Sequence, residues 1–144
     1  MSERAGPEVE IAPRAEDELD QLFGLALSAF GDLPGWDDER VLKALTRDTV
    51  FVAREHRQPA GYVALRPESS QATIIEQLLV APGHERRGIG RQLLAYAEGY
   101  AIAERMETLR VVVEADNELA HSFYRRSGFV PDSEIFELIL PRVR

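Results

Sequence analysis

Residues 73–96 read TIIEQLLVAPGHERRGIGRQLLAY, and this stretch decides the fold. Residues 73–80 are β-branched and aliphatic, a composition typical of a buried strand. The Ala-Pro-Gly segment at 81–83 ends that strand. A helix is predicted from Gly88-Ile89-Gly90 onward, because apolar residues then recur at helical spacing. These apolar residues are Leu93, Leu94, Ala97 and Ala101.

The turn between this strand and this helix has the features of an anion site. The first N–H groups of a helix have no acceptor within the helix, and glycine lets a phosphate approach the backbone closely. Residues 81–91 contain Arg86, Arg87 and Arg91 against Glu85, so three positive charges minus one give +2, inside a chain of net charge −8. This local positive charge favours a ligand that carries a polyphosphate.

Two other phosphate-binding motifs do not fit the turn. The dinucleotide fingerprint requires a third glycine three residues after the second, where this chain has Leu93. A P-loop requires lysine and then serine or threonine after its last glycine, where this chain has Arg91 and Gln92. Because a strand, a glycine turn and a helix also occur as a simple connection, the spacing alone leaves both interpretations open.

Length and composition bound the class of protein. A chain of 144 residues with 44% hydrophobic residues fits one domain, which we assign to residues 1–144. The absence of cysteine excludes disulfides, a thiolate nucleophile and cysteine metal ligands. Residues 1–10 lack the apolar core of a signal peptide, and no apolar run is long enough to span a bilayer. We therefore expect a cytoplasmic protein without a membrane partner.

The net charge of the chain limits the classes of partner that it is expected to bind. A net charge of −8 argues against a nucleic-acid partner, because the phosphate backbone would be repelled. The same charge is compatible with a cationic substrate such as an amine, and also with a simple role in solubility. His56, His84 and His121 do not have the spacing of metal ligands, so we expect no metal site.

The remaining elements indicate one mixed α/β domain. The predicted helices span residues 15–30, 37–45 (with Asp37 or Asp38 as N-cap), 88 to about 104, and 118–127 (with Gly128 as the C′ residue). The predicted strands span 9–12, 49–54, 60–65, 73–80, 108–114, 129–130 and 134–140, with turns at 56–59 and 131–133. The strands at 49–54, 60–65 and 73–80 should form an antiparallel meander. The nearly continuous aliphatic run at 108–114 is typical of a strand covered on both faces.

Two segments resemble a known family. Residues 78–94, LLVAPGHERRGIGRQLL, resemble the acetyl-CoA motif Arg/Gln-x-x-Gly-x-Gly/Ala of the GCN5-related N-acetyltransferases (GNAT). Residues 115–129, ADNELAHSFYRRSGF, resemble the family segment Asn-x-x-Ala-x-x-Phe-Tyr-x-x-x-Gly-Phe. The resemblance covers nearly the whole chain, and both motifs in order make it specific. The matching positions are Gly88, Gly90, Asn117, Ala120, Phe123, Tyr124, Gly128 and Phe129.

One position departs from the family pattern. The first motif position, arginine or glutamine in the family, is Glu85 here. Because a carboxylate beside a diphosphate is repelled, we expect Glu85 to point away and Arg86 and Arg87 to supply the positive charge.

The resemblance implies a fold and a way of binding acetyl-CoA. The expected fold is α/β: a mixed, mostly antiparallel sheet with a central parallel pair, 73–80 and 108–114, that splays apart, and helices on both faces. Splayed strands leave backbone groups unpaired, and the pantetheine arm of acetyl-CoA supplies partners for them like an extra strand. The implied cofactor-binding residues are Leu78, Leu79, Val80, Arg86, Arg87, Gly88, Ile89, Gly90, Arg91, Asn117 and Tyr124. The N–H group of Val80 is the expected donor to the thioester carbonyl.

The resemblance also implies direct attack of a primary amine on the thioester in a ternary complex. Tyr124 is then the candidate general acid for the leaving thiolate, with packing in the core as its alternative role; of the two adjacent rings, we expect Phe123 to be the core residue. Glu76 is the candidate base, directly or through a water, unless it only faces solvent or caps a neighbour. Glu114 is a weaker candidate. Asn117 suits both the cofactor and a helix N-cap.

Three functions compete at this point. The first is an acetyl-CoA-dependent N-acetyltransferase acting on a small-molecule or peptide amine, and the second is a non-catalytic acyl-CoA-binding module. The third is a protein-interaction domain without a nucleotide. The resemblance places the acceptor pocket near Phe30, Leu33, Trp36 and Tyr62, and it makes a homodimer possible. Acidic residues in the same region hint at a cationic acceptor, namely Asp32, Asp37, Asp38 and Glu39.

Overall fold

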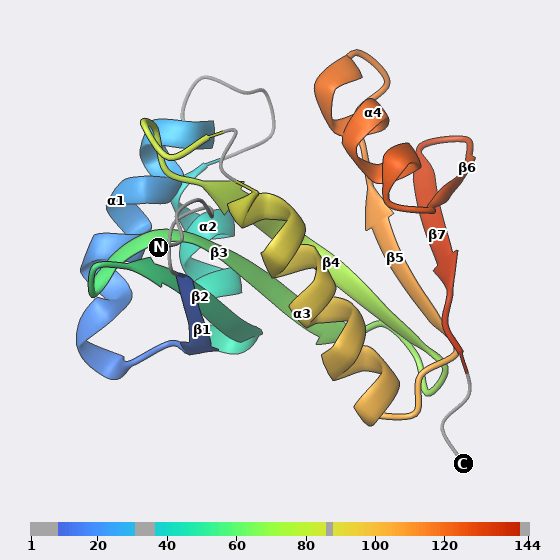
Figure 1. Cartoon of the computed structure of the whole chain (residues 1–144), viewed down its shortest axis with the longest axis horizontal. Helices are drawn as coiled ribbons and strands as arrows, with labels where there is room; N and C mark the ends of the chain where they lie inside the picture. The colour runs from blue at the N-terminus through green and yellow to red at the C-terminus, as the bar shows by residue number, and fades with distance from the viewer. Residues whose placement is uncertain (1–8, 31–36, 86–87, 142–144) are drawn as a thin grey trace, which may run out of the picture. The chain divides into compact units, whose positions relative to one another are not determined.

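The computed structural model describes residues 9–30, 37–85 and 88–141. Within them the elements follow one another as labelled in Figure 1. In chain order they are β1 (Val9–Pro13), a 3₁₀ turn (Glu16–Glu18), α1 (Leu19–Phe30), α2 (Asp38–Arg47), β2 (Thr49–Glu55), β3 (Gln58–Pro67), β4 (Ala72–Val80), α3 (Ile89–Ala103), β5 (Thr108–Val112), α4 (Glu118–Arg126), β6 (Val130–Asp132) and β7 (Ile135–Ile139).

The described strands form a mixed sheet in the order β1-β2-β3-β4-β5-β7-β6. The β4–β5 pair is parallel, with Ala72 opposite Thr108 and Ile75 opposite Val111 at the two ends of its ladder. The pairs β1–β2, β5–β7 and β6–β7 are antiparallel. A parallel pair needs a crossover connection, and α3 lies in that connection. The expected mixed sheet with a central parallel pair is therefore confirmed.

The chain divides into two compact units, and each is described by itself. The first contains the described residues up to Ala64 together with Gln77–Leu94. The second contains Leu65–Glu76 and the described residues from Ala95 onward. None of the helices in the described ranges combines the length and the apolar content that crossing a membrane requires.

In the first unit, successive residues of β3 face different helices. Tyr62 and Ala64 are fully buried in a cluster with Leu22 of α1 and Leu45 of α2. The neighbouring residue, Gly61, turns the other way, because a Cβ placed on it would lie 3.3 Å from Leu93 Cδ1 of α3. Successive residues of a strand point to opposite faces, so helices cover both faces of the sheet in this unit.

Two boundaries in the first unit differ from the prediction for reasons that the local hydrogen bonds and dihedral angles show. The helix expected over 15–30 begins with a 3₁₀ turn, in which Glu18 N–H donates to Ala15 O at 3.1 Å, and becomes α-helical only at Leu19. The hairpin loop expected over 56–59 is only His56 and Arg57, with φ angles of 54° and 69°. Positive φ at both central residues is the geometry of a two-residue hairpin turn, so Gln58 already belongs to β3. Of the two predicted N-cap residues, Asp37 and Asp38, the cap is Asp37, which accepts a bond from Arg40 N–H at 2.8 Å.

In the second unit, β5 alternates in burial, and the expectation of a strand covered on both faces is wrong. Leu109 and Val111 are buried, whereas Val112 is 54% exposed. The buried residues pair with Leu138 and Phe136 of β7, so only one face of this part of the sheet is covered. The strand also ends at Val112 instead of residue 114.

The two turns near the C-terminal end of the described chain compare differently with their predictions. Gly128 has a φ of 97°, which confirms it as the C′ residue of α4. The turn expected over 131–133 lies instead at Ser133 and Glu134, between Asp132 and its partner Ile135. Ser133 has a φ of 60°, a conformation for which serine gives no sequence signal.

Replacing the helical glycines Gly24 and Gly99 with alanine is expected to stabilise the protein. A Cβ at either position meets nothing within 4 Å, and alanine favours a helix over glycine by about 1 kcal/mol. We expect each variant to raise the midpoint of thermal unfolding by about 3 °C in calorimetry. Gly128→Ala is the matched control: its Cβ would lie 3.5 Å from Leu138, but its positive φ strains alanine, so its midpoint should fall. A lower midpoint for Gly24→Ala and Gly99→Ala would contradict the helix geometry.

Candidate active site

Strand β4 runs on beyond its parallel partner. The ladder with β5 joins residues 72–75 to 108–111, and β4 continues to Val80. In this extension Leu79 is buried at 4% exposed, while Leu78 and Val80 are half-buried. The next residue, Ala81, donates its N–H to Ala60 O of β3 at 2.7 Å, which ties the end of the strand to its antiparallel neighbour. The predicted arm-binding residues 78–80 thus lie past the last rung of the parallel ladder.

Helix α3 begins at the predicted glycine turn. Gly88 has a φ of 81°, a conformation that favours glycine, and Ile89 anchors the first turn at 1% exposed. The first bond that closes a helical turn runs from Gln92 N–H to Gly88 O at 3.0 Å. The N–H groups of Ile89, Gly90 and Arg91 precede it, and helix geometry gives these groups no acceptor within the helix. Such a terminus, with the exposed Arg91 beside it, favours a bound anion.

Glu85 is held within the turn itself. Its Oε1 accepts the N–H of Gly83 at 2.8 Å, and Gly83 has a φ of 91°. A local backbone donor thus engages the carboxylate that stands in the usual arginine or glutamine position of the motif. The predicted roles of Arg86 and Arg87 lie outside the described residues.

Tyr124 of α4 is the most buried aromatic side chain on its helix. It is 6% exposed, and its ring centroid lies 5.0 Å from Phe123, 5.3 Å from Phe129 and 6.3 Å from Phe136. Burial raises the pKa of the Tyr124 phenol far above its ordinary value, so the phenol keeps its proton at neutral pH. The expectation that Phe123 is the core residue of the two is wrong, because Phe123 is only half-buried.

The other predicted residues of the second unit have clear partners. Glu76 of β4 forms an ion pair with Arg66. Its Oε1 accepts a hydrogen bond from Arg66 Nε at 3.0 Å and lies 2.8 Å from a terminal nitrogen of the same guanidinium. Asn117 caps α4, because its Oδ1 accepts the N–H of Ala120 at 3.1 Å. The weaker candidate base, Glu114, is exposed. The structure shows the Asn117 cap and the ion pair of Glu76, whereas the roles of these residues in binding or catalysis remain predictions.

A match to a family model covers most of the chain. The model described as the acetyltransferase (GNAT) family matches residues 16–129, which include the end of β4, the start of α3 and all of α4. The chain belongs to the GNAT family. Its fold is therefore the acetyl-CoA-binding fold of these acetyltransferases.

Individual relatives agree with the family assignment. The uncharacterised N-acetyltransferase YhfO of Bacillus subtilis is 28% identical over 89 residues, or 58% of this chain and 60% of that relative. Ard1 from Thermoplasma volcanium has a TM-score of 0.80 at 16% identity, over 93% of this chain and 99% of that one. A GNAT family acetyltransferase from Elizabethkingia anophelis with acetyl-CoA bound has a TM-score of 0.74 at 18% identity, over 92% of this chain and 98% of that one. At these identities the structural likeness shows the fold alone.

The expected acceptor pocket of this GNAT domain is only partly described. Leu33, Trp36 and the side chain of Phe30 lie outside the described residues. Tyr62 does not line an open pocket, because it is fully buried and its hydroxyl donates to Gln77 Oε1.

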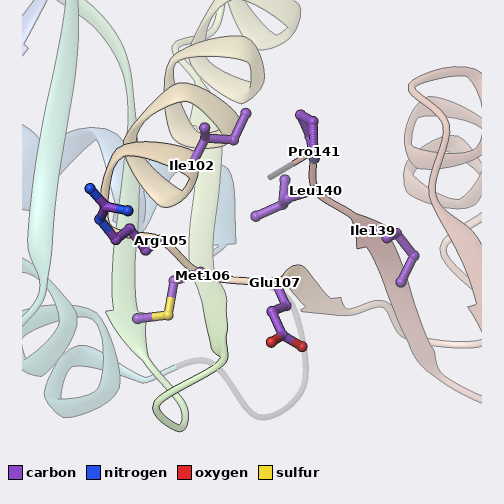
Figure 2. Close-up of a pocket in the computed structure, with 7 residues that line it drawn as sticks. All are labelled: Ile102, Arg105, Met106, Glu107, Ile139, Leu140 and Pro141. Carbon is purple, nitrogen blue, oxygen red and sulfur yellow. The ribbon is translucent and has the colours of Figure 1, made fainter. Parts of the chain in front are cut away.

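A hollow of about 310 Å³ in the second unit is a different feature (Figure 2). It lies at the C-terminal end of α3, whereas the predicted anion site lies at the N-terminal end, so it is not the candidate site. Its lining residues are Ile102, Arg105, Met106, Glu107, Ile139, Leu140 and Pro141.

The sequence prediction missed one ionisable pair. Glu55, at the end of β2, is 3% exposed, and its Oε1 lies 2.6 Å from His84 Nδ1 in the turn after β4. The two residues are 29 positions apart, and although His84 lies within the segment 78–94, that segment says nothing of a partner at Glu55. Only the pairing of strands in space brings them together, so the sequence offered no signal for this pair.

The buried tyrosines predict a loss of stability in alkaline solution. Burial raises the pKa of both Tyr62 and Tyr124 above the ordinary value of 10.0. Above pH 10 the unfolded chain therefore releases these protons while the folded chain retains them. The free energy of unfolding should fall by up to about 1.4 kcal/mol per pH unit for each tyrosine. Urea unfolding from pH 9 to pH 11 measures this slope, and Tyr124→Phe should make it shallower; an equal slope in the variant would contradict the burial of a protonated phenol.

Proposed function

We propose that this GNAT-family chain is an acetyl-CoA-dependent N-acetyltransferase that transfers the acetyl group directly to a primary amine of a small molecule or a peptide. The start of α3 carries the proposal: the N–H groups of residues 89–91 precede the first bond that closes a turn of this helix, and β4, the strand before it, runs on beyond its parallel partner. A diphosphate and an amide-rich arm have the chemistry that these two features would bind.

In this proposal the donor binds mostly through main chain. The diphosphate lies on the N–H groups from residue 87 to residue 91, with positive charge from Arg86, Arg87 and Arg91. The pantetheine arm pairs with residues 78–80. Asn117, which already caps α4, is proposed to bind the donor as well. Because the fold already holds these main-chain donors in place, little conformational entropy is lost when the ligand binds.

The proposed reaction is a direct displacement in a ternary complex. The amine nitrogen attacks the thioester carbon, a C–N bond forms and the C–S bond breaks. The N–H of Val80 stabilises the negative charge that develops on the carbonyl oxygen. Tyr124 gives its phenolic proton to the leaving thiolate, and Glu76 takes the proton that the amine loses. These 144 residues contain no cysteine, so no acyl-cysteine intermediate forms on them.

The ion pair at Glu76 favours a second candidate function, a non-catalytic acyl-CoA-binding module. Two nitrogens of the Arg66 guanidinium contact Glu76 Oε1, and a carboxylate held in this way has a structural role that needs no substrate. Such a module keeps the donor site at the start of α3 and has no turnover.

Calorimetry with acetyl-CoA, combined with an assay for released CoA thiol over a panel of amines, separates the candidates. The proposal predicts saturable heat with acetyl-CoA and thiol release with at least one amine. Because Asp37 and Glu39 add negative charge at the start of α2, the panel should include polyamines and cationic antibiotics beside peptide amines. Binding without thiol release supports the binding module, and no heat at all contradicts both.

Glu76→Gln is expected to lower kcat/KM about tenfold at pH 7, because the glutamine amide cannot accept the amine proton. The defect should shrink as the pH rises toward 9, since a growing fraction of the amine is then already deprotonated. Steady-state kinetics against pH measure both effects. Glu68→Gln is the matched control, because Glu68 also binds an arginine, Arg110 at 2.6 Å. A Glu76→Gln variant with the kinetics of this control would remove Glu76 from the reaction.

A further inference from the structure

The pair Glu55 and His84 has no part in the chemistry proposed above. Glu55 is a carboxylate at 3% exposed, and burying a carboxylate is costly unless hydrogen-bond donors hold it. His84 is one of its partners, at 2.6 Å from Nδ1 to Oε1, and the His84 side chain is 32% exposed. A carboxylate accepts hydrogen bonds, so Nδ1 is the donor in this contact, and this fixes both the tautomer and the orientation of the ring.

His84 lies in the connection from β4 to α3, and two other bonds in the described part of this connection are short-range. His84 N–H donates to Ala81 O at 3.0 Å, and Gly83 N–H donates to Glu85 Oε1 at 2.8 Å. Bonds of this kind shape a turn without attaching it to the rest of the fold. The contact from His84 to Glu55 reaches a different strand, β2, and so anchors the middle of the turn to the sheet.

We propose that Glu55 and His84 are a positioning pair: the buried carboxylate holds the imidazole, and through it residues 81–85 ahead of α3. Holding this segment in place fixes the direction from which α3 presents its first N–H groups to the diphosphate of the acyl donor. This inference rests on the proposed function. N–H groups that are already fixed lose no conformational entropy when the diphosphate binds. The anchor therefore contributes to the affinity for the acyl donor. It does not contribute to the chemical step.

Four variants and one control test the pair. Glu55→Ala and His84→Leu remove the contact. Glu55→Gln keeps an oxygen that can accept from Nδ1, and His84→Asn keeps a nitrogen donor near the position of Nδ1. Glu18→Gln is the control, because Glu18 is also a carboxylate of the first unit with a partner on β2, Arg54.

Two measurements are made on each variant. Calorimetry gives the Kd for CoA, and kinetics give KM for acetyl-CoA and kcat. Hydrogen exchange on the protein without ligand gives the rates of the His84 and Gly83 amides. We expect Glu55→Ala and His84→Leu to raise Kd and KM about tenfold with kcat within about twofold, and to speed exchange of both amides about tenfold. Glu55→Gln and His84→Asn should recover most of the loss, and Glu18→Gln should match the unmodified protein.

Two outcomes overturn the proposal. If Glu55→Ala and His84→Leu both keep the Kd of the unmodified protein, the anchor has no effect on binding. Weaker binding with unchanged amide exchange would instead make His84 a direct ligand of the donor. If the unmodified protein binds no CoA, the proposed function fails, whereas the exchange rates still report whether the pair holds the turn.

Discussion

Tyr124→Phe is expected to lower kcat about 100-fold while leaving the Kd for acetyl-CoA within about twofold, since a positioned general acid contributes about that factor or more. Burial keeps the Tyr124 phenol protonated at neutral pH, so the phenol holds the proton that the leaving thiolate must gain. The ring contacts with Phe123, Phe129 and Phe136 do not need the hydroxyl, so the variant should fold. Steady-state kinetics and calorimetry measure the two quantities.

The control for this prediction is Tyr96→Phe on α3. Tyr96 is 40% exposed and has no role in the proposed reaction, so its variant should keep kcat. An acceptor amine combined with acyl donors of better leaving thiols adds a second readout, because the need for a general acid falls as the thiolate leaves more readily. A Tyr124→Phe variant with unchanged kcat would show that the tyrosine only packs in the core.

Gly61→Ala is expected to destabilise the protein by about 2 to 3 kcal/mol and to abolish measurable binding of acetyl-CoA. A Cβ on Gly61 would lie 2.5 Å from Leu79 O and 3.2 Å from Val80 Cα, and both atoms are backbone. No side-chain rotation can relieve that overlap, so β4 must move away from β3. The displaced residues are the ones whose main chain is proposed to bind the pantetheine arm, so stability and binding should be lost together.

Urea unfolding and calorimetry with acetyl-CoA test this prediction. Gly99→Ala is the control for the added methyl group, since a Cβ there meets nothing within 4 Å. Leu93→Ala in the Gly61→Ala background tests the cause. Removing the Leu93 side chain relieves only the 3.3 Å contact, so it should not restore binding. A stable Gly61→Ala protein that binds the donor normally would contradict the close approach of β3 and β4.

Local patterns predicted much of the fold. The apolar stripe of α3 was confirmed, since Leu93, Leu94, Ala97 and Ala101 are all at most 2% exposed. Periodicity reports burial directly, which is why it succeeded. The caps at Asp37 and Asn117 were confirmed for a similar reason, because the interaction closes within three residues.

The features that the sequence did not predict share a physical cause, because each depends on contacts between residues that are distant in sequence. His56, Arg57 and Ser133 adopt positive φ without being glycine or asparagine, because the pairing of the flanking strands imposes the turn. The greater burial of Tyr124 relative to Phe123 depends on Phe129 and Phe136. At the candidate site, the motif indicated the start of α3, whereas the contact between Glu55 and His84 arises only from the packing of β2 beside the turn.

The central claim is that a diphosphate binds at the N-terminus of α3, and an NMR titration with CoA tests it most directly. The backbone amides of Ile89, Gly90 and Arg91 should show the largest shifts, because their N–H groups gain an anionic acceptor. Pantetheine, which has no diphosphate, should shift residues 78–80 and leave those three amides unchanged. If CoA binds and the chemical shifts of the amides of residues 89–91 do not change, the central claim is contradicted.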